Sequence, residues 1–502
     1  MLRNYLRIAV RTIQRHRTFA FLNILGLTTG IISFMIIVLF IQYELSYNDH
    51  IRHASDKYRV VEIQQAPGVG EQHVAVTMGP LAPALVRDFP EVIRAMRINR
   101  GYGLNVKYKD QTFIENNYAF ADSNVFEMLN VELLHGSQQR ALQELNAIVL
   151  SEKIAQKYFG TSEAAMGQTL AIMGESFMVR GIMKNYPPTS TVYFNALLPY
   201  KTLENRFEWL QRWGSNSIDT YVQLAPDATR QQLEAKFPAF IEKYISEHWN
   251  SGSMEMYLQP MEDIHLKSGH IKFQTYNYHQ GDIQQVRIFS AIALLILIVA
   301  CINYINLATS MALKRSREVG VRKVAGADRK RLIFQFLGES YSLTVLSALL
   351  AIAGIQVFLP MIANILGLPL TMDFGNPVFT VGLLTTILVV GLFSGLYPAF
   401  YISGFRPTVI FSGFRSSGGR GSSANLRKVL VVIQFSVSVV IIIATLIAFS
   451  QVRFLQTTDK GYNGKAVYAL PLHFEEEARQ DNVQLLKNEL KSHTGIRDVS
   501  AS

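Results

Sequence analysis

The sequence contains a single cysteine, Cys301, so no disulfide can form within the chain. That cysteine lies inside an apolar run, which argues against a thiolate metal site. There is no GxxxxGK[ST] phosphate loop, because the nearest stretch, GYNGKA, fails on spacing and lacks the final hydroxyl. HExxH and GxSxG motifs are also absent. We therefore expect a non-catalytic protein with no cofactor and no metal.

Charge is also scarce, because charged residues make up 17% of the sequence and hydrophobic residues 49%. A membrane-spanning helix needs roughly 20 apolar residues, since it rises about 1.5 Å per residue through about 30 Å of hydrocarbon. Five segments are long enough, and each is too long for the core of a cleavable signal peptide. They are residues 18–43, 288–313, 340–366, 377–403 and 429–452.

The basic residues gather beside these segments. Residues 1–17, 314–331 and 404–428 hold 18 of the 48 Lys and Arg residues but only 2 of the 38 Asp and Glu residues. Basic loops stay in the cytoplasm, so these three segments are predicted to lie inside, the first as a basic amphipathic helix. Residues 44–287 and 453–502 then lie outside. Since topology explains the net charge of +10, we expect no nucleic-acid partner.

The large external segment, residues 44–287, has the pattern of a mixed α/β domain. Strand-like runs occupy residues 57–63, 104–110 and 147–150, and helical patterns occupy residues 81–89 and 230–246. Two pairs of histidines lack the companions of a metal site, so we interpret them as solvated surface residues. The pairs are His50 with His53 and His265 with His270.

A weak internal repeat links the two ends of the chain. LRKVLVVIQF opens the last apolar segment much as LRNYLRIAV precedes the first, and each leads to an external segment. Residues 404–428 include the flexible Gly/Ser linker RSSGGRGSSAN between the halves. We therefore expect residues 453–502 to begin a second external domain. The permease partner would be the missing remainder of a second unit or another copy of the chain.

Small and polar residues inside the apolar segments predict helix contacts. GxxxG pairs allow close approach of helix backbones, within one subunit or between subunits, and buried amides form hydrogen bonds across helices. These residues are Gly26 with Gly30, Gly391 with Gly395, and Asn303 and Asn306. Pro398 is expected to bend its segment near the cytoplasm. Glu339, at a segment boundary, is expected to pair with nearby cations rather than to relay protons.

The loop KRSREVGVRKVAGADRKR, residues 314–331, joins the second and third segments. Val319, Val321 and Val324 alternate with Arg322 and Lys323, which predicts a surface helix with apolar and basic sectors. On spacing alone, these cations need do no more than fix topology and contact anionic lipid headgroups. Docking of a partner protein is the alternative.

A family resemblance favours the second role. The stretch INYINLATSMALKRSREVGVRKVAGADRKRLIFQFLGES closely resembles the signature region of FtsX-like, MacB-type permeases of ABC transporters. NVFEMLNVELLHG, AIVLSEKIAQKYFG and VYFNALLPY are similar to the external domain of that family, and GLYPAFYISGFRP to the end of its fourth span. The resemblance implies a helical membrane protein with a MacB-like α/β external domain and an FtsX-like core formed by residues 288–331 and 332–403.

The resemblance also implies a separate ABC ATPase that docks on the loop as on a coupling helix. The coupling residues would be Arg317, Glu318, Val319, Gly320, Arg322, Lys323 and Gly326. The protein would export a peptide, a macrolide-like compound or a lipoprotein across the inner membrane of a bacterium, with a periplasmic adaptor and an outer-membrane channel as further partners. An alternative is an FtsX-like regulator that activates an external hydrolase or sensor without moving cargo.

Overall fold

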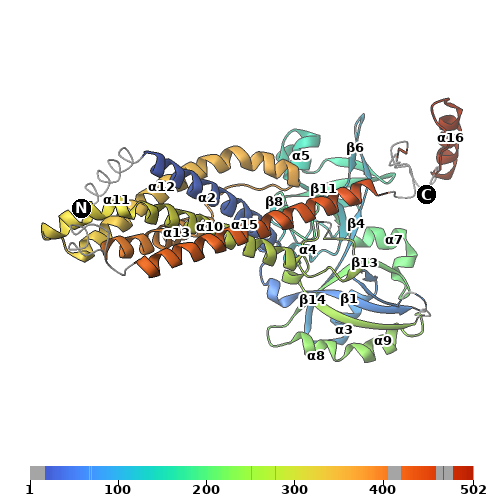
Figure 1. The fold of residues 1–502 in the computed structure, drawn as a ribbon. Helices are drawn as coiled ribbons and strands as arrows, with labels where there is room; N and C mark the ends of the chain where they lie inside the picture. Colours follow the sequence, from blue (N-terminus) through green and yellow to red (C-terminus); the bar gives the residue numbers. More distant parts are fainter. Residues whose placement is uncertain are drawn as a thin grey trace. The chain divides into compact units, whose positions relative to one another are not determined.

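The computed structural model describes residues 17–66, 68, 70–249, 252–277, 279–404, 420–458, 467–468 and 479–500. The contacts within the chain divide it into two compact units (Figure 1). A helical unit holds Met1–Leu45 and Gln284–Asn463, and an α/β unit holds Ser46–Ile283 and Gly464–Ser502. Of the predicted segments, residues 1–16 lie outside the described residues, as do residues 405–419 of the linker.

The helical unit contains five described helices long and apolar enough to span a membrane. A shorter helix, α11, connects the second and third of them. Together with the α/β unit they confirm the predicted class, a helical membrane protein with a large mixed domain. The six helices are α2 (Arg17–Leu45), α10 (Ile283–Ser310), α11 (Ala312–Val324), α12 (Arg329–Leu366), α13 (Pro377–Ser403) and α15 (Arg420–Thr457).

Local signals fix the ends of two of these helices. The side chain of Asn376 accepts hydrogen bonds from the backbone N–H groups of Val378 and Phe379, and Pro377 occupies the first turn of α13. The helix α12 ends at Leu366 and is followed by Gly367, whose φ of 66° favours glycine. The helix α12 begins at Arg329, well before residue 340, where the apolar run is expected to begin. Hydropathy does not reveal this start, because the first turns of the helix carry polar residues.

The helix α12 is packed against both α2 and α13. One apolar cluster joins the three helices through residues such as Ile31, Ala351 and Leu383, and a second joins α10 to them through Ala300 and Val390. The helix α15 differs, because none of the residues in its most apolar stretch is buried within the chain. Its described polar link to the others is a hydrogen bond of 3.2 Å between Asn306 Nδ2 and Gln434 Oε1.

The α/β unit is built on a mixed sheet with strand order β15-β2-β1-β13-β4-β7-β12-β9-β11-β10-β5-β6 among the described residues. The remaining strands extend it at the sides, with β14 paired to β1, β3 to β13 and β8 to β11. The strands are β1 (Lys57–Ala66), β2 (Gly70–Val74), β3 (Thr77–Met78), β4 (Val92–Gly101), β5 (Leu104–Tyr108), β6 (Gln111–Glu115), β7 (Tyr118–Ala121), β8 (Leu133–Gly136), β9 (Ala147–Ser151), β10 (Thr169–Ile172), β11 (Glu175–Met183), β12 (Ala196–Pro199), β13 (Asn216–Leu224), β14 (Ser253–Pro260) and β15 (Ile271–Phe273).

Short helices connect and cover these strands. They are α3 (Leu81–Asp88), α4 (Val125–Met128), α5 (Glu152–Phe159), α6 (Ser162–Ala165), α7 (Tyr200–Arg206), α8 (Arg230–Glu234) and α9 (Phe237–Tyr244), with single turns at Ala54–Asp56, Glu208–Gln211 and Met261–Asp263. The helix α16 (Arg479–Ser492) belongs to the C-terminal segment of this unit. The helical pattern expected over residues 230–246 is divided between α8 and α9. Pro238 explains the division, because it has no N–H to bond to the carbonyl of Glu234.

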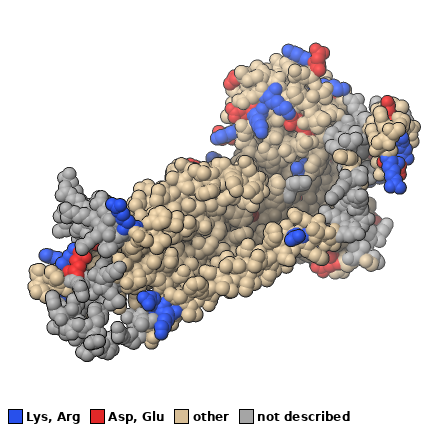
Figure 2. Space-filling view, turned by 45° about the horizontal axis from the view of Figure 1, so that its top comes forward, with Lys and Arg blue, Asp and Glu red and all other residues tan. Residues whose placement is uncertain are grey.

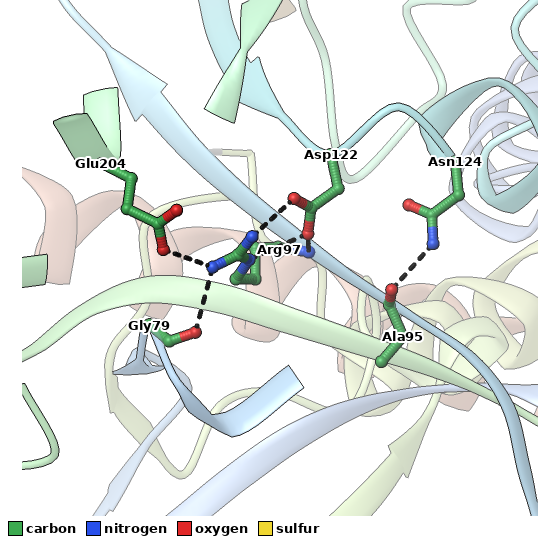
Figure 3. A network of polar contacts seen from close by, with 6 residues as sticks. All are labelled: Gly79, Ala95, Arg97, Asp122, Asn124 and Glu204. Atoms are coloured by element: carbon green, nitrogen blue, oxygen red, sulfur yellow. Dashed lines mark hydrogen bonds and ion pairs between the residues drawn. The ribbon is translucent and has the colours of Figure 1, made fainter. Parts of the chain in front are cut away.

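A half-buried arginine ties α7 to the sheet in this unit (Figure 3). Arg97 of β4 forms ion pairs of 2.9 Å with Asp122 and 2.8 Å with Glu204, and its guanidinium lies 4.1 Å from the ring centroid of Tyr200. Beside it, the side chain of Asn124 donates a hydrogen bond of 2.8 Å to the carbonyl of Ala95. The charge of Arg97 is thus balanced by two carboxylates, so we interpret the network as structural.

The interpretation of all four predicted histidines as solvated is wrong for His265. This residue is 2% exposed and stacks on Tyr47 with ring centroids 3.4 Å apart. His50 is also half-buried, and loss of solvent lowers its pKa to about 4. His270 bonds to Tyr257 across 2.9 Å. Aromatic packing explains these positions.

Candidate coupling site

The helix α11 lies in the predicted coupling loop, and glycine ends it. The helix stops at Val324, and Gly326 follows with φ of 87°, a conformation that favours glycine. The N–H of Ala327 then bonds to the carbonyl of Arg322 across 2.9 Å, and α12 begins two residues later at Arg329. The predicted segment 314–331 is therefore a short helix, a glycine turn and the first residues of α12.

One face of α11 is packed against α12 and α13. Val319 is 1% exposed and belongs to an apolar cluster with Leu332 and Phe336 of α12 and Ala399 and Ile402 of α13. The next predicted residue, Gly320, is also buried. Burying one valine side chain contributes about 1.5–3 kcal/mol, so this contact holds the helix in place.

Charged side chains of α11 reinforce the packing. Arg322 forms an ion pair of 2.7 Å with Glu318, and its other terminal nitrogen donates to Gln335 Oε1 across 3.0 Å. Gln335 Nε2 in turn donates to Glu339 Oε1 across 3.3 Å. A continuous polar chain thus runs from Glu318 on α11 to Glu339, one turn beyond Gln335 on α12.

Lys323 joins α11 to α13. Its Nζ donates a hydrogen bond of 2.7 Å to the carbonyl oxygen of Ser403, the last residue of α13. Burial lowers the pKa of Lys323, and the nearby charge of Arg329 lowers it further. The bond satisfies one of the carbonyl groups that a helix leaves without a partner at its C-terminal end.

The other described face of α11 is open. Val321 is 61% exposed and Val324 is 68% exposed, although both are apolar. At about 100° per residue, Val321 lies about 200° around the helix from the buried Val319, so the three valines do not form one sector. Of the predicted residues, Arg317 lies in α11, but its side chain is outside the described part of the chain.

The surface of the helical unit is almost uncharged along the flank that Figure 2 shows, and its described Lys and Arg side chains gather mainly at one end. The helix α11 lies at this end (Figure 1). In the described ranges, no group of three or more His, Cys, Asp or Glu residues has a metal-binding arrangement.

The predicted packing residues lie at contacts between helices. A Cβ built on Gly26 would lie 2.8 Å from Asn303 Nδ2, and one built on Gly30 would lie 2.6 Å from the Cβ of Ala300. Both glycines of α2 therefore face α10. On α13, Gly391 lies against Tyr341 and Gly395 against Ser340, so this pair faces α12. These contacts are within one chain.

Three further predicted residues have described surroundings. Asn306 bonds to Gln434 of α15, and Pro398 is buried inside α13, which continues to Ser403. Glu339 takes part in the polar chain of Arg322 and Gln335. Sequence reasoning missed Gln335 and the carbonyl of Ser403. Gln335 lies four positions before Glu339, so on a helix the two polar side chains face the same side. This spacing could have identified Gln335 from the sequence.

Comparisons with known proteins connect both units to transporters. The family model "MacB-like periplasmic core domain" matches residues 20–240, and "FtsX-like permease C-terminal" matches residues 290–407. The chain is 24% identical to the pyoverdine export ATP-binding/permease protein PvdT of Pseudomonas syringae pv. syringae, over 61% of this chain and 44% of that protein. It is 22% identical to the uncharacterised ABC transporter permease YvrN of Bacillus subtilis, over 69% of this chain and 85% of that protein.

A solved structure, the periplasmic region of MacB from Actinobacillus actinomycetemcomitans, aligns with 43% of this chain and 95% of its own, with 14% identity and a TM-score of 0.31. The chain spans less than half the length of PvdT.

Proposed function

This chain belongs to the FtsX-like, MacB-type permeases of ABC transporters, and on that premise we propose that it carries ATPase-driven motion across the inner membrane to its extracytoplasmic domain for export of a substrate. A multi-pass inner-membrane protein with an extracytoplasmic domain has the parts that this task needs. The ATPase would lie on the cytoplasmic side, where the charge of the basic loops predicts that these loops and the N-terminus lie.

The observation that supports the proposal is the packing of α11 against two membrane-spanning helices. Val319, Arg322 and Lys323 attach the helix to α12 and α13, and Val321 and Val324 remain exposed on its other side. A helix fixed to two membrane spans moves with them when a partner displaces it. Exposed apolar side chains on the same helix offer that partner a contact surface.

The roles of the coupling residues follow from this arrangement. Val321 and Val324 would contact the ATPase, and Glu318, Val319, Gly320, Arg322 and Lys323 would transmit its motion into the spans, with Gly326 forming the turn. The substrate would engage the external domain, as a peptide, a macrolide-like compound or a lipoprotein. A periplasmic adaptor, an outer-membrane channel and a second permease unit would complete the assembly.

The experiment tests the proposed contact of Val321 and Val324 with the ATPase without disturbing the residues that attach α11 to α12 and α13. In Val321→Asp/Val324→Asp, we expect the ATPase to be lost from the permease purified in mild detergent, while the unfolding temperature stays unchanged, because both side chains are exposed. The matched control is Val86→Asp/Ile93→Asp, two exposed apolar residues of the α/β unit, which should leave ATPase binding unchanged. Undiminished ATPase binding by the α11 variant would refute the proposed contact. A co-purified cell-wall hydrolase in place of an export channel would favour the regulatory alternative.

A further inference from the structure

Two histidines from different parts of the α/β unit meet at one tyrosine hydroxyl. His73 lies on β2, Tyr257 lies on β14, and His270 directly precedes β15. His73 Nδ1 is 3.2 Å from the hydroxyl oxygen of Tyr257, and His270 Nε2 is 2.9 Å from it. The two imidazole rings are 4.8 Å apart between their centroids, at an angle of 83°. Two ring nitrogens therefore converge on one oxygen atom, and none of the three residues belongs to the coupling site.

The register of the sheet explains why these residues meet. The strands β1 and β14 are paired along one side of the α/β unit (Figure 1). One residue of β1 is paired with His73 on one side and with Glu255 on the other. Directly paired residues and residues two positions apart point to the same face of a sheet, so His73, Glu255 and Tyr257 share a face. Ile271 of β15 is paired with His73, which brings the preceding His270 to the same place.

A carboxylate determines which nitrogen of His73 carries the proton. His73 Nε2 lies 3.2 Å from Glu71 Oε1, and an ionised carboxylate can only accept, so Nε2 is the donor. In the neutral ring, Nδ1 then has a free lone pair, and Nδ1 is the nitrogen that faces Tyr257. Histidines that bind metal ions commonly donate their other N–H to a carboxylate in this way.

His270 is suited to the same role. Partial loss of solvent lowers its pKa, and the charges of His73 and Arg59 lower it further. The ring is therefore neutral at neutral pH, which is the form that binds metal ions. Because the side chain is exposed, water can carry the Nε2 proton to Nδ1 when a metal ion takes its place.

The charges beside the two histidines accommodate a cation. Glu71 of β2 and Glu255 of β14 are exposed carboxylates on the same face as His73. Arg59 opposes a further positive charge, but its side chain is fully buried and donates a hydrogen bond of 2.7 Å to Gln259. The two exposed carboxylates offset this buried charge.

We propose that His73 Nδ1 and His270 Nε2 bind a divalent transition-metal ion of the Zn²⁺ class, with Tyr257 Oη as a third, weaker ligand and water completing the coordination. Imidazole nitrogens suit Zn²⁺, whereas Mg²⁺ and Ca²⁺ prefer oxygen ligands. In a tetrahedral zinc site with bonds of about 2.0–2.1 Å, neighbouring ligand atoms lie about 3.3 Å apart. The distances of 3.2 Å and 2.9 Å from the Tyr257 oxygen to the two nitrogens are already close to that spacing.

The sequence does not reveal this site, because its residues come from three separate segments and one of them is a tyrosine. The set also differs from the groups of three or more His, Cys, Asp or Glu residues, none of which is found with a metal-binding arrangement in the described ranges. The expectation of a protein without metal rests on motifs within single segments, and a pair of histidines that meets only in the folded sheet lies outside them.

The test measures Zn²⁺ binding by isothermal titration calorimetry. The full chain is purified in a neutral detergent through an affinity tag that contains no histidine. We expect saturable Zn²⁺ binding that Mg²⁺ and Ca²⁺ do not reproduce. In His73→Gln/His270→Gln, which removes both ring nitrogens, Zn²⁺ affinity should fall by about tenfold or more.

The matched control is His53→Gln/His248→Gln, which removes two exposed histidines of the same unit and should leave the affinity unchanged. Tryptophan fluorescence during heating without metal verifies that each variant is folded. If the double variant does not fold, His270→Gln alone decides the question, because His270 is exposed and its replacement should not unfold the protein.

Three results would overturn the proposal: no saturable Zn²⁺ binding by the native sequence, undiminished binding by the folded variants of His73 and His270, or an equal loss in the control. The cluster lies wholly within the α/β unit and shares no residue with α11. None of these results therefore bears on ATPase coupling, and loss of ATPase binding through α11 leaves the histidine cluster intact.

Discussion

Lys323 of α11 donates a hydrogen bond of 2.7 Å to the carbonyl oxygen of Ser403, the residue that ends α13. A cation at this position interacts favourably with the partial negative charge at a helix C-terminus. The bond also fixes the distance between α11 and the end of a membrane-spanning helix. Lys323 therefore belongs to the attachment of α11 and not to its open face.

Replacing Lys323 tests this attachment. In Lys323→Met the bond to Ser403 is lost, and we expect the free energy of unfolding of the helical unit to fall by about 1 kcal/mol, with weaker stimulation of the ATPase. The matched control is Lys330→Met, since Lys330 is exposed at the start of α12. Thermal unfolding in detergent and ATPase assays with the partner check both effects. An equal response of the two variants would mean that only net charge matters.

The second prediction concerns Gly30. A Cβ at this position would lie 2.6 Å from the Cβ of Ala300, closer than carbon atoms pack, whereas a Cβ at Gly382 meets nothing within 4 Å. We expect Gly30→Ala to destabilise the helical unit by about 1–3 kcal/mol through overpacking. Gly382→Ala should be neutral or stabilising by up to about 1 kcal/mol, because alanine favours helix.

The recovery of monodisperse protein after heating in detergent measures this difference. Both substitutions add the same methyl group to a membrane helix, so hydrophobicity is matched between them. Equal losses would show that α2 and α10 do not approach as closely as the structure describes.

The membrane helices were the most predictable part of the fold. A long apolar run has few alternatives to a membrane span. The helix α13 covers the expected residues 377–403, and Asn376 and Pro377 mark its start. The start of α12 at Arg329 was not predictable from hydropathy, since its first turns are polar. Likewise, the hydrophobic spacing over residues 230–246 predicts one continuous helix, whereas Pro238 divides it into two.

The sequence predicts where the candidate site lies, but it does not predict the contacts that the structure shows there. The basic loop and the family resemblance both indicate residues 314–331. The partner of Lys323, however, is a backbone carbonyl 80 residues away, which side-chain patterns cannot reveal. Hydrophobic spacing also treats Val319, Val321 and Val324 alike, although tertiary packing buries only the first.

The third prediction is a pH dependence that arises from Glu62. Burial raises the pKa of this fully buried carboxyl to about 8, although hydrogen bonds from Gln64 and Asn216 oppose the shift. The unfolded chain releases this proton near the ordinary pKa of 4.5. Between these values the folded state holds the extra proton, so the stability it confers is complete at low pH and is lost as the pH rises through 8.

We expect the unfolding temperature of the α/β unit to fall between about pH 6 and about pH 8, and Glu62→Gln to flatten that decline. The three tryptophans, at positions 209, 213 and 249, all lie in this unit, so their fluorescence reports its unfolding. Asp219 titrates in a lower range, because burial raises its pKa to about 6. Glu175→Gln, at an exposed carboxylate, is the control. An unchanged slope in Glu62→Gln would assign the dependence to another group.

The last prediction concerns orientation, on which the proposed coupling depends. Cys301→Ser gives a chain without cysteine, because Cys301 is the single one in the sequence. Val324→Cys and Ser137→Cys are then introduced separately, at an exposed position of α11 and at an exposed position of the α/β unit. A membrane-impermeant maleimide should label Ser137→Cys in intact spheroplasts and Val324→Cys only after the membrane is opened.

The physical reason is the charge of the loops. Residues 314–331 carry eight Lys and Arg residues against two acidic ones, and such loops are retained in the cytoplasm. An odd number of spans between two labelled sites would place them on opposite sides, and the single helix α10 connects the α/β unit to α11. If the maleimide reached Val324→Cys in intact spheroplasts, α11 would face away from any source of ATP, and its exposed valines would have to serve a partner outside the cell.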